Sequence, residues 1–96
     1  MIDIEKRIAS LERKATKLGL SSRSHGTQIV RLLADRAFLA SRNMKLPPHD
    51  QECALIWSVG IGGIQLPKLF YYGETIAEAL RRAEHGVAAI AKTRRP

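Results

Sequence analysis

The sequence lacks most of the features that would assign the chain to a specialised class of protein. Of its 96 residues, one is a cysteine and five are aromatic. The single thiol, Cys53, excludes an internal disulfide and a cysteine-based structural zinc site, and it predicts a reducing compartment, the cytoplasm. Because aromatic residues are scarce, Leu, Ile, Val and Ala must fill most of the core.

Long hydrophobic segments are also absent. The longest nearly apolar run, residues 53–64, has 12 residues and contains three glycines, whereas a helix needs about 20 apolar residues to cross a bilayer. The first residues are charged and periodic, unlike a secretory signal. We therefore expect no membrane span.

Acidic residues are few, and the excess positive charge is unevenly distributed. The net charge of +7 comes from 16 Lys and Arg against 9 Asp and Glu. Residues 1–46 carry ten basic and four acidic residues, residues 47–80 carry one and four, and residues 81–96 carry five and one. The two basic ends predict an acidic partner, either nucleic acid or an acidic protein surface. The alternative is that these side chains only solvate helix surfaces.

Hydrophobic spacing predicts a helix near each end of the chain. The first helix, capped by Asp3, has a stripe made of Ile4, Ile8, Leu11, Ala15 and Leu18. Gly19, followed by an apolar residue, is typical of a helix C-terminus. The last helix begins at a capping box, Thr75 to Glu78. Its stripe consists of Ile76, Leu80, Ala83, Val87 and Ile90, and Gly86 lies inside the pattern, where it could stop or weaken the helix.

The middle of the chain predicts one more helix and a hairpin. A helix from Thr27 to Asn43 follows from the stripe Ile29/Val30, Leu33, Ala37, Ala40 and Met44, and it ends before Pro47-Pro48. The apolar run Cys53–Val59 predicts a buried strand, residues 60–63 a turn, and residues 64–72 a returning strand that Pro67 makes an edge.

Together these elements predict a single small α+β domain over residues 1–92, followed by a basic tail over residues 93–96. The order is α-α-β-β-α, with a two-stranded antiparallel hairpin packed against three helices. A two-stranded hairpin has free edges that another chain can extend, so a homodimer is an expected form.

No catalytic or cofactor motif is recognisable. The glycines of residues 60–63 follow a strand, but they lack the third glycine and the helix of a dinucleotide fingerprint, so they predict a turn. Residues 49–53 gather His, Asp, Glu and Cys side chains that can bind a metal or act as nucleophile and base, but an acidic loop leading into a strand explains them as well. We interpret the chain as a binding protein and not an enzyme, with no cofactor and no metal.

Basic side chains along the helices indicate binding to nucleic acid or to a nucleoprotein complex. Contacts with phosphates give strong salt dependence and weak sequence preference. The candidate residues are Arg7, Arg13, Lys14, Lys17, Arg23, Arg31, Arg42, Arg94 and Arg95. Tyr71 and Tyr72 could stack on bases, but strand alternation turns one of them inward, so core or interface use is the alternative.

The polar connector of residues 21–27 is a candidate anion site. Amides at the start of the predicted second helix carry partial positive charge and could close around a phosphate or carboxylate together with nearby hydroxyls. The candidate residues are Ser24, His25, Gly26 and Thr27. The alternative is an ordinary capping connector.

The stretch from Leu66 to Ala83 resembles the segment of HicB-like antitoxins in which a strand passes through Leu-Pro and Gly-Asp/Glu-Thr into a Glu-Ala-Leu helix. The likeness is carried by Leu66, Pro67, Gly73, Glu74, Thr75, Glu78, Ala79 and Leu80. The resemblance implies a binding role, but the predicted order, with two helices ahead of only two strands, departs from that family. It accords with a second hypothesis, a protein-binding regulator of antitoxin or inhibitor type that uses the hairpin edge and the Trp57 region as its interface.

Overall fold

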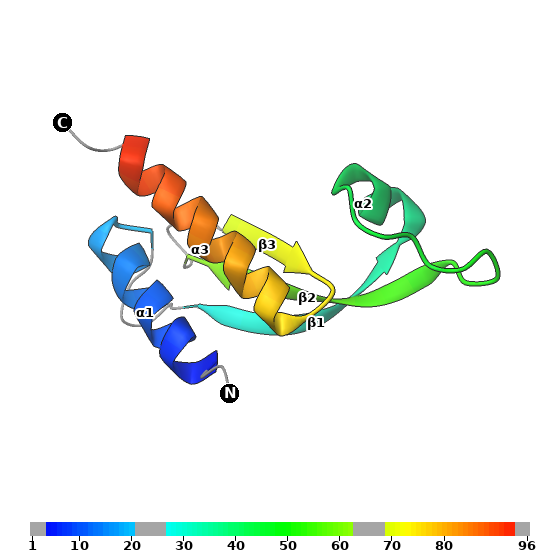
Figure 1. Cartoon of the computed structure of the whole chain (residues 1–96), viewed down its shortest axis with the longest axis horizontal. Coiled ribbons are helices and arrows are strands. Elements are labelled where there is room, and N and C mark those ends of the chain that lie inside the picture. Colours follow the sequence, from blue (N-terminus) through cyan, green and yellow to red (C-terminus); the bar gives the residue numbers. More distant parts are fainter. Residues whose placement is uncertain (1–3, 21–26, 63–68, 94–96) are drawn as a thin grey trace.

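Three antiparallel strands form the centre of the structure, a computed structural model that describes residues 4–20, 27–62 and 69–93. Strand β2 (Cys53–Ile61) lies between β1 (Gln28–Asp35) and β3 (Leu69–Gly73). Helix α1 (Ile4–Lys17) precedes the sheet, α2 (Arg36–Ser41) follows β1 directly, and α3 (Ile76–Thr93) follows β3. The chain is thus one small domain of mixed helix and strand, as predicted, but with three strands (Figure 1).

The strands differ in length, which gives the sheet two unlike ends. All of β1 pairs with β2, from Gln28 opposite Gly60 to Asp35 opposite Cys53. Strand β3 pairs only with residues 57–61 of β2. Beyond that point β1 and β2 continue as a two-stranded ribbon, and the molecule extends 48 Å along its longest axis. We call residues 32–56 the ribbon end and the other described residues the helical end.

At the helical end, α1 and α3 cover one face of the sheet. Val59 and Ile61 of β2 lie against both helices in a cluster that is almost free of solvent. Buried with them are Leu11, Ala15, Ala79, Leu80, Ala83 and Val87. Apart from Ala79, these helix residues belong to the stripes that the sequence predicted for the first and last helices, so both helices are confirmed.

At the ribbon end, α2 covers the opposite face. Leu39 of α2 packs with Ala34, Met44 and Ile56, and Tyr72 of β3 borders this second cluster. Neighbouring residues of a strand point to opposite faces, so Ile56 faces α2 while Val59 faces α1 and α3. Each face of the sheet is therefore covered at one end and bare at the other.

The prediction of a helix from Thr27 to Asn43 is wrong, because residues 28–35 form β1. The face of the sheet that is covered by helices changes along this strand. Ile29 packs toward α1 and α3 on one face, whereas Leu32 and Ala34 pack toward α2 on the other. The change of face spaces the apolar residues by three, which imitates a helical stripe. The predicted two-stranded hairpin against three helices is corrected accordingly.

Helix α2 is a single short segment whose ends are set by local hydrogen bonds. The Asp35 carboxylate accepts a hydrogen bond from the Phe38 N–H at 2.8 Å and so caps the helix at its start. Asn43 has a φ of 54°, and the Met44 N–H donates to the Leu39 carbonyl at 2.9 Å. The chain thereby leaves the helix with Met44 buried in the second cluster.

The ends of α1 and α3 follow the predicted capping chemistry. Gly19 has a φ of 74°, and the Leu20 N–H donates to the Ala15 carbonyl at 2.8 Å, which ends α1. The Thr75 hydroxyl accepts from the Glu78 N–H at 3.1 Å at the start of α3. Helix α3 includes Thr93, the first residue of the predicted basic tail, and residues 94–96 lie outside the described part.

Two glycines are required by close packing around β3. A Cβ on Gly73 would lie 2.5 Å from the backbone nitrogen of Ala79, because the strand ends directly against α3. A Cβ on Gly86 would lie 2.4 Å from the Tyr71 ring. Gly86 therefore does not stop α3 but lets the helix approach the sheet. No helix in the described residues is long and apolar enough to span a membrane.

Candidate nucleic-acid interface

Helices α1 and α3 lie side by side on the same face of the sheet and point in the same direction. Arg7, in the first half of α1, forms an ion pair with Glu84 of α3, with 2.6 Å between Nη2 and Oε1. Its Nε also donates to Glu84 Oε2 at 3.4 Å. This hydrogen bonding raises the pKa of Arg7 above its usual value. The pair ties the two helices together and keeps Arg7 charged.

On α1, positive and negative side chains lie on different sides. Glu5 and Glu12 are seven residues apart and so lie on one side, and Glu12 accepts a hydrogen bond from the Thr27 N–H at 3.1 Å. Helical spacing puts the basic residues on the side that turns outward and toward α3. These residues are Lys6, Arg7, Arg13, Lys14 and Lys17.

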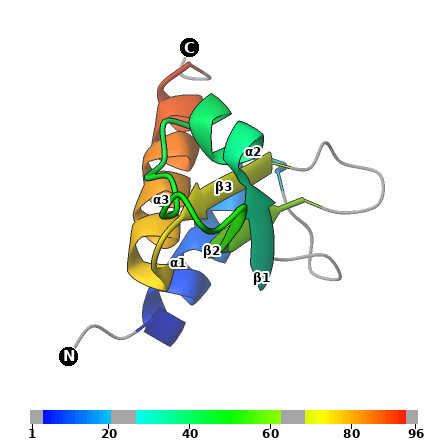
Figure 2. The ribbon, with the colours of Figure 1, turned by 90° about the vertical axis from the view of Figure 1, so that its right-hand side faces the viewer.

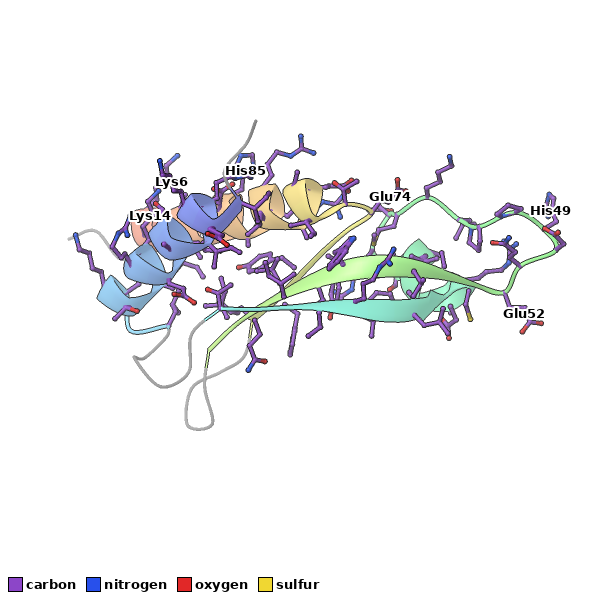
Figure 3. All side chains as sticks on the ribbon, turned by 90° about the horizontal axis from the view of Figure 1, so that it is seen from below. Lys6, Lys14, His49, Glu52, Glu74 and His85 are labelled. Carbon is purple, nitrogen blue, oxygen red and sulfur yellow. The ribbon has the colours of Figure 1, made fainter. Side chains whose placement is uncertain are left out.

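On α3, an exposed line of cations runs parallel to those of α1. Arg81 and Lys92 are eleven residues, or three turns, apart and both are exposed. His85 lies between them on the same line. Figure 3 shows Lys6, Lys14 and His85 on the side of the helices that faces away from the sheet. We call the six exposed cations on this side the basic face: Lys6, Arg13, Lys14, Lys17, Arg81 and Lys92.

Small side chains lie between the two lines of cations. Lys14 and Lys17 border a shallow hollow whose floor includes Val87, Ala88 and Ala91 of α3. Alanines leave the space between the helices open, so the cations on either side can reach a ligand lying along it.

The acidic residues of the two helices leave most of this positive charge uncompensated. Glu84 pairs with Arg7, and Glu78 pairs with Arg82 at 2.9 Å. Among the described residues, the basic-face members with no ion-pair partner are Arg13, Lys14, Lys17, Arg81 and Lys92. Such a cluster produces a positive potential over the outer surface of the helix pair.

Two of the other predicted nucleic-acid residues, Arg31 and Arg42, do not join this face. Arg31 lies on β1, with its guanidinium carbon 5.1 Å from the centre of the Trp57 ring. Arg42 ends α2 at the ribbon end and lies over the rings of Phe38 and Tyr72, at 5.4 and 5.3 Å. Three further candidates are outside the described residues: Arg23, Arg94 and Arg95.

The predicted anion site loses the helix on which it was based. Thr27 precedes β1, not a helix, so no helical N-terminus concentrates positive charge there. Its N–H already donates to the Glu12 carboxylate. The remaining residues of that prediction, Ser24, His25 and Gly26, are outside the described part.

The two tyrosines pack against opposite clusters. Tyr71 borders the cluster under α1 and α3, and burial raises the pKa of its phenol. Tyr72 borders the cluster under α2 and makes an edge-to-face contact with Phe38 at 4.9 Å. Both rings therefore contribute to packing. His49 and Glu52 lie at the far tip of the ribbon end (Figure 3), and the described residues contain no group of three side chains that could hold a metal ion.

The chain was also compared with known proteins. No protein-family model, no curated protein and no solved structure matches the chain. The likeness of residues 66–83 to HicB-like antitoxins is therefore not supported by a family match. The structure does account for part of it, because Gly73 fits where a Cβ would clash and Thr75 caps α3.

Sequence reasoning missed three members of the basic face: Lys6, Arg81 and Lys92. The helical spacing of Arg81 and Lys92 was a usable signal, because both lie opposite the apolar stripe of a confirmed helix. Nothing in the sequence indicated that α1 and α3 are neighbours, since this depends on how two helices distant in sequence pack on one sheet.

Proposed function

We propose that the protein binds nucleic acid, without catalysis, by laying the basic face of α1 and α3 against the phosphate backbone. The observation that carries the proposal is the parallel arrangement of two helices on which Arg13, Lys14, Lys17, Arg81 and Lys92 have no acidic partner among the described residues. Lysine and arginine side chains on such a surface neutralise phosphates and release condensed counterions.

The composition of the basic face supports contact with the phosphate backbone more than recognition of bases. Its cations are mostly lysines, which act as point charges, and no described aromatic side chain lies among them. Both tyrosines and Phe38 are engaged in the two clusters. We therefore expect weak sequence preference.

The test is the salt dependence of binding to a fluorescent duplex of arbitrary sequence. If about four phosphates are contacted, the slope of log K against log salt is near −3.6 for DNA, a loss of roughly a hundredfold in affinity between 50 and 200 mM salt. Absence of binding to DNA or RNA at 50 mM salt and micromolar protein rejects the proposal.

A matched pair of variants tests the location. Lys14→Gln with Lys17→Gln removes two charges from the basic face and is expected to reduce the slope by about 1.8. Arg42→Gln with Lys45→Gln removes the same charge from the ribbon end and is expected to leave the slope unchanged. Equal effects of the two variants would mean that net charge, and not the basic face, determines binding.

A further inference from the structure

Strand β1 forms one edge of the sheet in the part of the chain that the structure describes. It pairs with β2, and no other described strand lies beyond it. Its eight residues include neither proline nor lysine, two residue types with which proteins commonly block such an edge. An edge of this kind is able to accept another strand.

Exposed leucines lie next to this edge on the same face of the sheet as α1 and α3, but at the ribbon end, where this face is bare. Leu33 is 65% exposed and Leu55, directly opposite it on β2, is 55% exposed. Their cross-strand pairing places the two side chains together on one face. They form an apolar surface at the ribbon end that no described residue covers.

Two opposite charges flank Leu33 on the same face of β1. Arg31 and Asp35 are each two residues from Leu33, so all three side chains share one face. Within one chain the two charged residues are about 14 Å apart, four residues at about 3.4 Å each, and cannot meet. Neither has an ion-pair partner among the described residues.

We propose that the partner of this edge is a second copy of the chain, whose β1 pairs antiparallel with the first about a two-fold axis at Leu33. This register places Leu33 beside its own copy. The two Leu55 side chains then flank this pair of leucines, one on each outer side. Arg31 of each chain then lies opposite Asp35 of the other, so the pairing brings the exposed leucines into contact with one another and matches both charges on this face of β1.

The neighbouring registers are less favourable. In an antiparallel pair, residues directly opposite each other have their side chains on the same face of the sheet. The two-fold axis must therefore lie beside a residue that is opposite its own copy, and not between two consecutive residues. An axis at Arg31 sets the two guanidinium groups opposite each other. An axis at Leu32 puts Asp35 opposite Ile29. Only the axis at Leu33 pairs the charges.

Helix α2 does not obstruct the edge. It turns from the end of β1 back over the sheet, so that Phe38 contacts Tyr72 of β3. Figure 2, seen along the long axis, shows β1 at the side of the sheet away from α3. The two-fold axis is perpendicular to the sheet, so the dimer would have six strands with both basic faces on the same side.

Cysteine cross-linking without nucleic acid tests the contact and its register independently of the proposed function. In a Cys53→Ala background, Leu33→Cys is expected to form a covalent dimer with a short bismaleimide. Val30→Cys is the control, since Val30 is comparably exposed at 52% but would lie about 20 Å from its copy. Cross-linking of both, of neither, or of Val30→Cys alone overturns the proposal.

Charge reversal supplies a second test by sedimentation equilibrium, in which the dimer has twice the 10.7 kDa mass of the chain. Arg31→Asp sets two carboxylates opposite each other at each end of the contact and is expected to raise the dimer dissociation constant about tenfold. Adding Asp35→Arg is expected to restore the dimer, although it also removes the carboxylate that caps α2 at the Phe38 N–H. A monomeric wild-type protein, or a double variant no tighter than Arg31→Asp, contradicts this register.

Discussion

The two ends of the molecule are built on the same pair of strands but differ in cover and in charge. At the helical end two long helices cover the sheet, and α1 and α3 together carry eight basic residues and four glutamates. At the ribbon end one helix of six residues covers the opposite face, and residues 32–56 carry three basic and three acidic residues. One end thus has a stable core under a charged surface, and the other has a thin core beside exposed leucines.

This difference follows from where each helix can bury its apolar side. Helices of 14 and 18 residues present several turns of apolar side chains to the sheet, whereas α2 buries mainly Leu39. Stability per helix increases with the apolar surface that it buries. The helical end should therefore supply most of the free energy of unfolding, and the ribbon end should be its less stable extension.

The largest expected effect compares one leucine from each cluster. Leu80 is fully buried and Leu39 is 1% exposed. Leu80→Ala should cost about 3–5 kcal/mol and Leu39→Ala about 2–3 kcal/mol, because the thinner cluster collapses more easily around a cavity. Urea denaturation measures both values. A larger loss for Leu39→Ala would reverse the comparison.

Two glycines of the helical end provide the next test. Gly73→Ala should cost about 2–3 kcal/mol, because its Cβ meets backbone atoms of Ala79 that cannot move independently. Gly19→Ala has open space around its Cβ and should cost about 1 kcal/mol, from the positive φ alone. Thermal denaturation of the two variants compares them directly, and equal losses would mean that the contact at Gly73 is not tight.

The cap of α2 gives a smaller effect confined to the ribbon end. Asp35→Ala removes the acceptor for the Phe38 N–H and should cost about 1 kcal/mol, whereas Asp35→Asn keeps an acceptor and should cost little. Hydrogen exchange should show faster exchange of α2 amides in Asp35→Ala, with α3 amides little changed. Uniformly faster exchange would mean that both ends unfold together.

The smallest expected effect appears at alkaline pH. The pKa of Tyr71 is raised in the folded state by burial, so its contribution to stability is complete below the unfolded pKa of about 10 and declines as the pH rises above it. Tyr71→Phe cannot ionise and should lose less stability than the wild type between neutral pH and pH 11. An identical pH dependence of both proteins would exclude a role for this phenol.

The sequence was informative where one element buries one regular stripe. The stripes of α1 and α3, the cap at Thr75 and the apolar run of β2 gave correct elements, because each depends on local periodicity or local hydrogen bonds. Strand β1 was assigned to a helix because its partly buried side chains, Ile29 and then Leu32, face different helices. Its true partner is β2, and the paired residues are 18 to 32 positions apart in sequence, from Asp35 and Cys53 to Gln28 and Gly60.

The candidate interface was predictable only in part, for the same reason. Arg13, Lys14 and Lys17 were named from the sequence because they lie opposite the stripe of α1. Their combination with Arg81 and Lys92 depends on the packing of α1 beside α3, which the Arg7–Glu84 pair stabilises. Arg31 and Arg42 were grouped with them on one long predicted helix, of which residues 28–35 form β1 and only residues 36–41 are helical.

The most direct test of the account is a map of backbone amide shifts during titration with a short duplex. We expect the largest shifts in α1 and α3, around Lys14, Lys17, Arg81 and Lys92, and we expect these shifts to diminish as salt is added. Residues 36–52 of the ribbon end should shift little. Shifts concentrated in α2 and the loop after it, or spread evenly over the chain, would contradict the assignment of binding to the helical end.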